Sequence, residues 1–193
     1  RKLEVLSINQ KSFLQSLKIK VKLSFFNELN IKRIHQLNNK TNQFNFTGIR
    51  LTEEEILKKI YNRNYYVICA NVSDKFGNYG ITCLIYLKKE MDTILIENWI
   101  MSCRVFGKTI EIAILLEILK WLHEKKIDKI KGIYIPTTKN TVIQNLYKSL
   151  YFKKEKTDQL NQNKIIYIFN NNLKSNLDKI NHYCEIKNEL NNP

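Results

Sequence analysis

Hydrophobic and polar residues alternate with the period of a half-buried strand in several segments of the chain. Two of these segments flank the run Asp74-Lys75-Phe76-Gly77-Asn78-Tyr79, whose Asp, Gly and Asn residues are typical of a hairpin turn. Turn geometry favours a structural role over a ligand site for this run, up to Gly80. The predicted strands are Ile19–Phe25, Tyr65–Ser73, Gly80–Lys88, Thr93–Met101, Ile127–Ile135 and Lys164–Phe169.

Helical periodicity appears between these strands. Thr52 and Glu55 form the pattern of a capping box and predict a helix that runs to about Tyr61. The segment from about Lys108 to Lys126 is apolar around most of its circumference, so we expect it to pack deeply against a sheet. Further helices are predicted over Asn27–Asn39 and from Asn140 or Thr141 to about Tyr151, with a polar loop at Lys40–Thr47.

The resulting order is β-α-α-β-β-β-α-β-α-β, with no repeat and no internal boundary. It predicts one α/β (α+β) domain over residues 18–170, with a central mixed sheet flanked by helices on both faces. Residues 1–17 are expected to form a short helix or linker from an upstream domain, because the chain begins with Arg rather than Met. Residues 171–193 are expected to be a polar tail, either helical around Leu177–Tyr183 or frayed.

Composition narrows the class of protein. The 193 residues are 44% hydrophobic, which suits one domain with a sizeable core. The richest apolar run, Ile110–Leu122, contains three charged residues and is not expected to cross a membrane. Four cysteines without a CxxC pair, and three histidines far apart, argue against a metal site or a disulfide framework. We expect Cys69 and Cys83 to be small core residues, and the compartment to be reducing and cytoplasmic.

The net charge of +14 fits an anionic partner, which would be nucleic acid, the phosphates of CoA or an acidic carrier protein. A general enrichment in Lys, Asn and Ile explains the same charge without any partner. The lysines are scattered, and no nucleic-acid-binding motif is present, which argues against nucleic acid.

The segment Ser102–Thr109 holds the most informative chemistry. It lies between a predicted strand and the start of the long helix, where unpaired backbone N–H groups and the helix dipole favour an anion. Arg104, Lys108 and the hydroxyl of Thr109 add donors, and Cys103 lies at the mouth of this site.

The element order and this loop resemble the GNAT acyltransferase fold. In that family an Arg/Gln-x-x-Gly-x-Gly/Ala loop holds the pyrophosphate of CoA; here the loop departs from the pattern at its last position, Thr109. The resemblance implies that CoA, acyl-CoA or a phosphopantetheine arm binds here, with pantetheine lying as an added strand between the fourth and fifth strands. The implied cofactor-binding residues are Met101, Arg104, Val105, Phe106, Gly107, Lys108, Thr109 and Asn140.

Four longer sequence motifs narrow the resemblance to one group of GNAT-like proteins. Residues 40–47 (KTNQFNFT), 74–80 (DKFGNYG), 101–107 (MSCRVFG) and 135–140 (IPTTKN) occur in an order that looks like the C-terminal GNAT-like domain of FkbH-like proteins. Those proteins load a glyceryl unit from a phosphoglycerate onto an acyl carrier protein for polyketide extender units. The resemblance therefore implies an acyl carrier protein as partner, together with an upstream haloacid-dehalogenase-like domain whose Asp-x-Asp signature is absent from this chain.

Two residues are candidates for catalysis. Cys103, near a helix N-terminus and beside Arg104, would be the nucleophile that carries the acyl group; the alternative is a buried residue at the strand end. Tyr147 lies five residues before Phe152, a spacing that resembles the GNAT general acid, and would protonate a leaving thiolate. The alternative for Tyr147 is a residue at the edge of the core.

Several polar residues have two explanations. Asn42, Gln43 and Asn45 would bind the hydroxyls of an acyl substrate, or their side chains would cap local turns. His35 is better explained as a structural residue than as a catalytic one. Glu97 would act as a base through water if it faces a cleft, but strand alternation allows it to face outward.

Three functions remain open from the sequence. The first is an acyltransferase that acts on a carrier-bound substrate, and the second is a non-catalytic module that docks the carrier arm or CoA. The third is an acetyl-CoA-dependent N-acetyltransferase. The four sequence motifs that resemble FkbH-like proteins argue against this third function. The departure at Thr109 favours the docking module.

Overall fold

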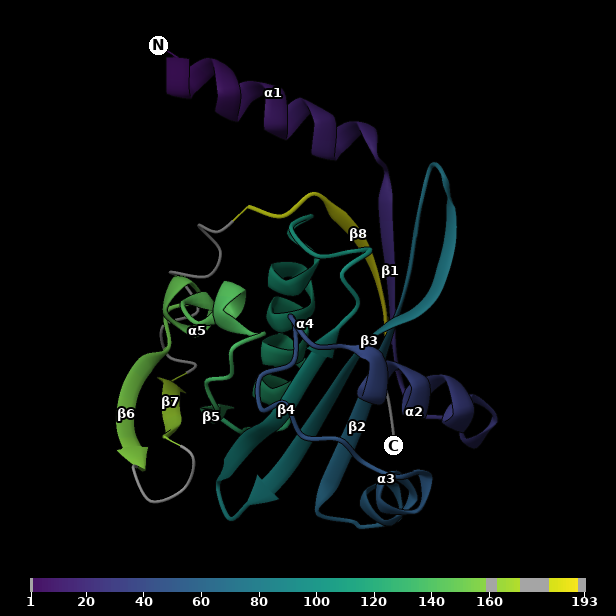
Figure 1. The fold of residues 1–193 in the computed structure, drawn as a ribbon, viewed down its shortest axis with the longest axis vertical. Coiled ribbons are helices and arrows are strands. Elements are labelled where there is room, and N and C mark those ends of the chain that lie inside the picture. The colour runs from purple at the N-terminus through teal and green to yellow at the C-terminus, as the bar shows by residue number, and fades with distance from the viewer. Residues whose placement is uncertain (1, 159–162, 171–180, 191–193) are drawn as a thin grey trace.

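The computed structural model describes residues 2–158, 163–170 and 181–190, and it confirms the predicted fold class (Figure 1). The described strands form one mixed sheet in the order β6-β7-β5-β4-β3-β2-β1-β8. The pairs β4/β5 and β1/β8 are parallel, and the other neighbours are antiparallel. The strands are β1 Ile19–Phe25, β2 Tyr65–Asp74, β3 Gly77–Glu90, β4 Thr93–Met101, β5 Lys129–Tyr134, β6 Lys153–Asp158, β7 Lys164–Asn170 and β8 Cys184–Glu189.

Helices cover both faces of the sheet. The helices α2 and α3 pack on one face and α4 on the other, while α1 extends away from the body of the fold (Figure 1). None of the described helices is long and apolar enough to cross a bilayer. The helical elements are α1 Lys2–Ser16, η1 Glu28–Asn30, α2 Ile31–Lys40, α3 Glu53–Ile60, α4 Ile110–Glu124, η2 Thr141–Ile143 and α5 Leu146–Ser149.

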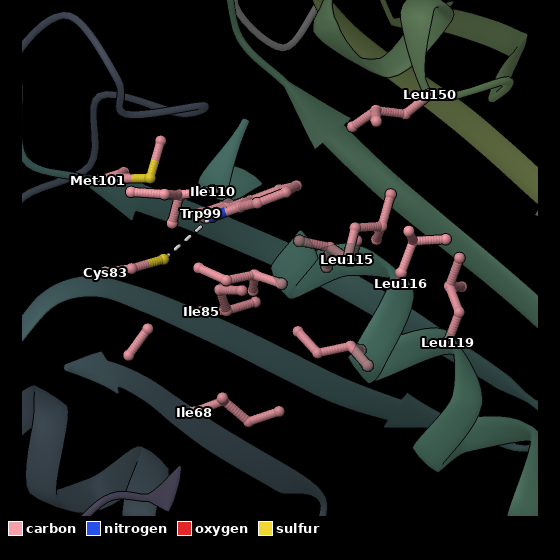
Figure 2. Close-up of a cluster of buried hydrophobic side chains, with 14 of the residues drawn as sticks. Ile68, Cys83, Ile85, Trp99, Met101, Ile110, Leu115, Leu116, Leu119 and Leu150 are labelled. Atoms are coloured by element: carbon pink, nitrogen blue, oxygen red, sulfur yellow. Dashed lines mark hydrogen bonds between the residues drawn. The ribbon is translucent and has the colours of Figure 1, made fainter. Parts of the chain in front are cut away.

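The larger core lies between the sheet and α4. Its side chains come from both, and the indole Nε1 of Trp99 donates a hydrogen bond to the sulfur of Cys83 at 3.2 Å (Figure 2). Helix α4 is buried along most of its length, as its all-round apolar surface predicted. Cys69 and Cys83 are buried in the sheet, which confirms their prediction as core residues, and burial raises the pKa of the Cys83 thiol to about 12.

Local signals predicted several elements correctly. The capping box of α3 is present, with the Thr52 hydroxyl accepting from the N–H of Glu55 and the Glu55 carboxylate accepting from the N–H of Thr52. The predicted hairpin is also confirmed, although its turn is confined to Lys75 and Phe76. The Asp74 carboxylate accepts from the N–H of Phe76 at 2.9 Å and so fixes this turn.

Other predictions were wrong. The sequence did not predict β6 or β8; β6 is an edge strand made of charged and polar residues, and β8 lies within the segment expected to be a polar tail. The helix predicted up to Tyr151 is divided into η2 and α5. The possible helix around Leu177–Tyr183 lies mostly outside the described residues, and its last three residues are not helical.

Candidate functional site

A cavity of about 900 Å³ opens beyond the end of β4, between α2, the loop after α2, the β4–α4 loop and the loop after β5. We call it the cationic pocket. Four basic side chains line it, and no Asp or Glu among the described residues does so. Residues from three of the four sequence motifs, 40–47, 101–107 and 135–140, line this pocket. The residues that define the pocket are Arg33, Lys40, Asn42, Cys103, Arg104 and Lys139.

Cys103 is the exposed cysteine of this pocket. It lies in the turn that follows β4 and is exposed, so the alternative of a buried residue at the strand end is wrong. Its neighbour Arg104 also lines the pocket, and the Arg104 Nε donates to the hydroxyl of Ser102 at 3.4 Å. The structure therefore brings a solvent-accessible thiol and a guanidinium to one wall, as the sequence predicted.

Arg33 is a pocket residue that the sequence analysis missed. Its Nε and Nη2 donate to the carbonyl of Ile81 at 3.1 and 2.9 Å, and its Nη1 donates to the Gln36 side chain at 2.6 Å. Since a guanidinium has five N–H groups, two remain without an acceptor in the described part of the chain. The signal was available, because Arg33, Gln36, Leu37 and Lys40 have the spacing of one helix face.

Arg33 and Arg104 are close enough to repel each other. Burial lowers the pKa of Arg33, and the positive charge of Arg104 lowers this pKa further. No carboxylate of the described residues forms an ion pair with either guanidinium. Two such groups facing one cavity are complementary to an anionic ligand, which would relieve their repulsion.

The remainder of the predicted phosphate loop is engaged within the protein. Lys108 binds the Asp74 carboxylate at 3.1 Å, and that carboxylate also accepts from the hydroxyl of Tyr79. Thr109 adopts a left-handed conformation with φ of 60°, and its hydroxyl accepts from the N–H of Tyr183 at 3.4 Å. Of the loop residues predicted to bind CoA, only Arg104 and Phe106 line the pocket; Met101 and Val105 are buried, and Gly107, Lys108 and Thr109 lie outside its lining.

The N-terminus of α4 already has an acidic group. Glu111, in its first turn, is 8% exposed. Its Oε2 is buried without a hydrogen-bond partner among the described residues, and burial raises the pKa of this carboxyl group. The helix end predicted to hold a pyrophosphate therefore has a buried acidic residue in its first turn.

A short segment fills the gap between β4 and β5. We call Phe44-Asn45-Phe46 the strap. The N–H of Phe46 donates to the carbonyl of Trp99 at 3.1 Å, the N–H of Met101 donates to the carbonyl of Phe44 at 2.9 Å, and the N–H of Ile135 donates to the carbonyl of Phe46 at 2.8 Å. The strap therefore lies where pantetheine was expected as an added strand, and that predicted placement is wrong.

The predicted site residues Asn45 and Asn140 hold the strap. The Asn140 side-chain amide is buried and donates to the carbonyls of Asn45 and Ile135 at 2.9 and 3.0 Å. The Asn45 side chain is also buried, and its Oδ1 accepts from the N–H of Gly48 at 2.9 Å. For Asn45 the structure shows the alternative of capping a local turn. Asn42 and Gln43 line the cationic pocket, and Asn42 accepts from Arg50.

A second cavity, of about 410 Å³, lies beyond the strap, and we call it the Glu97 pocket. The Glu97 carboxylate faces it and binds the ammonium of Lys59 at 2.5 Å and the hydroxyl of Tyr65 at 2.8 Å. Burial and the bond to Glu97 raise the pKa of Tyr65 to about 12. Phe44 lines the first pocket and Thr47 the second, so the strap separates the two cavities.

Tyr147 lies in neither pocket. It is 1% exposed, its hydroxyl has no hydrogen-bond partner among the described residues, and burial raises its pKa well above the ordinary value. Its ring packs 4.5 Å from that of Phe46, measured between centroids. A Cβ at Gly132 would lie 2.3 Å from the Tyr147 ring, so this glycine is needed for the close approach. In this arrangement Tyr147 is a core residue without access to a substrate.

The other sequence candidates lie at the surface or form no cluster. His35 is partly exposed, with its Nδ1 3.7 Å from the carboxylate of Glu53. Within the described residues, no group of His, Cys, Asp and Glu side chains is arranged to hold a metal ion.

Comparison with known proteins places the fold. The chain is similar to an N-acetyltransferase (PaiA) of Thermoplasma acidophilum solved with coenzyme A, with TM-score 0.63, 17% identity and coverage of 78% of this chain and 99% of that one. It is also similar to the spermidine/spermine N-acetyltransferase SpeG of Vibrio cholerae, with TM-score 0.60, 16% identity and coverage of 83% and 99%. The ribosomal-protein-S18-alanine N-acetyltransferase of Escherichia coli has TM-score 0.59, 10% identity and coverage of 78% and 93%.

These similarities show that the chain has the GNAT fold. No protein-family model matches the sequence. No curated protein matches it either.

Because the Glu111 carboxyl group is buried, we expect Glu111→Gln to raise the free energy of unfolding, by an amount that depends on pH. Because its pKa is raised in the folded chain, the wild-type fold is favoured while this group is protonated and loses that contribution as pH rises past about 4.5, the ordinary value. Urea unfolding should therefore show the variant more stable at pH 7 and equal to wild type below about pH 4. Glu54→Gln, at the same helix position of α3 but exposed, should change little. An unchanged or lower stability of Glu111→Gln at pH 7 would contradict this assignment.

The burial of Tyr147 predicts that Tyr147→Phe keeps both fold and activity. Removing a buried hydroxyl without a partner should raise the free energy of unfolding by about 1 kcal/mol or leave it unchanged. Turnover should stay within about twofold of wild type. A large loss of turnover at unchanged stability would restore the general-acid role for this residue.

Proposed function

We propose that this chain is an acyltransferase in which Cys103 takes the acyl group within the cationic pocket. The observation that carries this proposal is the exposed thiol of Cys103 beside four basic side chains, in a cavity that no described carboxylate lines. The GNAT fold supports acyl transfer as the reaction class, because the similar solved proteins are N-acetyltransferases.

The reaction has two steps. The sulfur of Cys103 attacks the carbonyl carbon of the donor, a C–S bond forms, and the bond to the leaving group breaks; the leaving group takes the electron pair and the proton lost by the thiol. In the second step an incoming thiol attacks the Cys103 thioester. A new thioester forms on the acceptor, and Cys103 regains a proton.

Arg33 and Arg104 suit the charge that this chemistry creates. Both guanidinium groups line the pocket that contains Cys103, and both keep N–H groups free of described protein acceptors. They are placed to hold a phosphate or carboxylate of the donor, or the oxyanion that forms at its carbonyl. Asn42 and Gln43, on the facing loop, supply amide groups for hydroxyls of the acyl chain.

The resemblance to FkbH-like proteins gives this proposal its finer form. The acyl group is then glyceryl, and the acceptor is the phosphopantetheine thiol of an acyl carrier protein in cytoplasmic polyketide extender-unit synthesis. An upstream haloacid-dehalogenase-like domain handles the phosphate. CoA presents the same thiol as a carrier arm and enters the cationic pocket by the same route. The basic lining supports both, since each brings phosphate groups to the mouth of the pocket.

The comparisons favour a second candidate, an acetyl-CoA-dependent N-acetyltransferase. In that function an amine would bind in the Glu97 pocket, which the carboxylate of Glu97 on β4 lines. The strap counts against direct transfer, because it separates this pocket from Cys103 and the basic residues. A docking module without catalysis remains the third function, and it predicts no covalent adduct.

Intact mass of the chain after incubation with a glyceryl thioester of N-acetylcysteamine tests the proposal. We expect one acyl adduct per chain, absent from Cys103→Ala and retained by Cys184→Ala, which removes a partly buried cysteine outside the pocket. Arg33→Gln should slow adduct formation roughly tenfold or more, since a charge-assisted bond contributes about 1.5–3 kcal/mol. Arg63→Gln, an exposed arginine away from the pocket, is its matched control.

The same chain separates the competing functions. Acetylation of spermidine by acetyl-CoA at equal rates in wild type and Cys103→Ala would establish the N-acetyltransferase. Binding of a carrier protein without any adduct on either chain would establish the docking module.

A further inference from the structure

We propose that the strap is a permanent substitute for the pantetheine arm. A pantetheine thiol therefore reaches this chain only through the cationic pocket and not between β4 and β5. This inference rests on the proposed function for the route of acyl transfer, but the filled gap is a property of the fold alone. Nothing in the chemistry of Cys103 is needed to test the filled gap.

The backbone between β4 and β5 leaves no edge for a ligand. The two parallel strands pair from Thr93–Lys129 to Ile96–Gly132 and then diverge. Beyond that point a ligand would need the carbonyl of Trp99 and the N–H of Met101. Both are bonded to the strap, which runs antiparallel to β4 through the bridge between Asn45 and Ile100.

The side chains of the strap hold it there. Phe46 is 0% and Phe44 1% exposed, and both belong to the core between the sheet and α4. The Phe46 ring stacks on Trp99, with 5.7 Å between ring centroids and 12° between ring planes. Phe44 meets Trp99 edge-on at 5.7 Å. To vacate the gap, both rings would have to leave the core and the bond from Asn140 to Asn45 would have to break.

The other anchor expected for CoA, the start of α4, carries a buried acidic residue. In the resemblance to GNAT proteins, the start of the helix after β4 holds the pyrophosphate. Here Glu111 is buried in the first turn of that helix, and the N–H of Tyr183, in the segment entering β8, donates to the hydroxyl of Thr109. When ionised, a carboxylate in this first turn would repel a phosphate at the same helix end, because both groups carry negative charge.

The closed gap limits the route that an acyl group can take between the two pockets. Since the strap lies between the cationic pocket and the Glu97 pocket, an acyl group cannot pass directly from a donor on one side to an acceptor on the other. In the proposed function donor and acceptor use the opening of the cationic pocket in turn, and Cys103 holds the acyl group between the two visits. An acceptor thiol at the end of a long flexible arm suits this geometry, because the thiol alone has to enter.

Amide chemical shifts and amide hydrogen exchange of the ¹⁵N-labelled chain test the filled gap, with CoA and 4′-phosphopantetheine as probes up to millimolar concentration. We expect the amides of Phe46, Met101 and Ile135 to exchange only with global unfolding, and at rates that change less than twofold with either probe. Shift changes confined to the lining of the cationic pocket, or no changes at all, support the proposal. Faster exchange at Phe46, or shift changes centred on Met101 and Ile135, would overturn it.

A Cys103→Ala chain gives the same readout without any acyl transfer. If its strap amides stay protected while the wild-type chain forms no adduct, the proposed function fails and this inference stands. If a probe displaces the strap while the adduct still forms, this inference fails and the proposed function stands. Comparing CoA with 4′-phosphopantetheine separates recognition of the nucleotide from recognition of the shared phosphate.

Discussion

The divergence of β4 from β5 is the constraint on which this structure depends. Two parallel strands that separate inside a fold expose backbone N–H and C=O groups that must find partners, because buried unpaired groups are costly. In this chain the strap supplies the partners, bonding Trp99 and Met101 on one side and Ile135 on the other. The gap is thereby filled as part of the core, and the Asn140 side chain donates a hydrogen bond to the strap.

With the gap filled, the chemistry that we propose is confined to the cationic pocket. The loop after α2 that supplies the strap also supplies Asn42 and Gln43 to the pocket wall, so one segment closes one site and lines the other. Beside it, Arg33 and Arg104 face the cavity without described carboxylate partners. An excess of positive charge next to an exposed thiol suits the transfer that we propose, of an anionic or phosphate-bearing acyl group.

Much of this was predictable where the signal is local. The capping box at Thr52, the hairpin after Asp74 and the apolar helix α4 each depend on neighbouring residues, and each was found. The strap and β8 were not found, because both depend on pairing with strands distant in sequence. Cys103 and Arg104 are neighbours in sequence, and both line the cationic pocket as the sequence led us to expect. Arg33 joins them only through the tertiary packing of α2.

The initial velocity of acyl transfer, measured while donor and carrier-arm acceptor are varied together, tests the central claim most directly. Transfer through Cys103 at one shared opening predicts parallel lines in double-reciprocal plots, as in a double-displacement reaction, because the first product leaves before the acceptor enters. Intersecting lines would mean that donor and acceptor bind together. They would contradict the relay through Cys103.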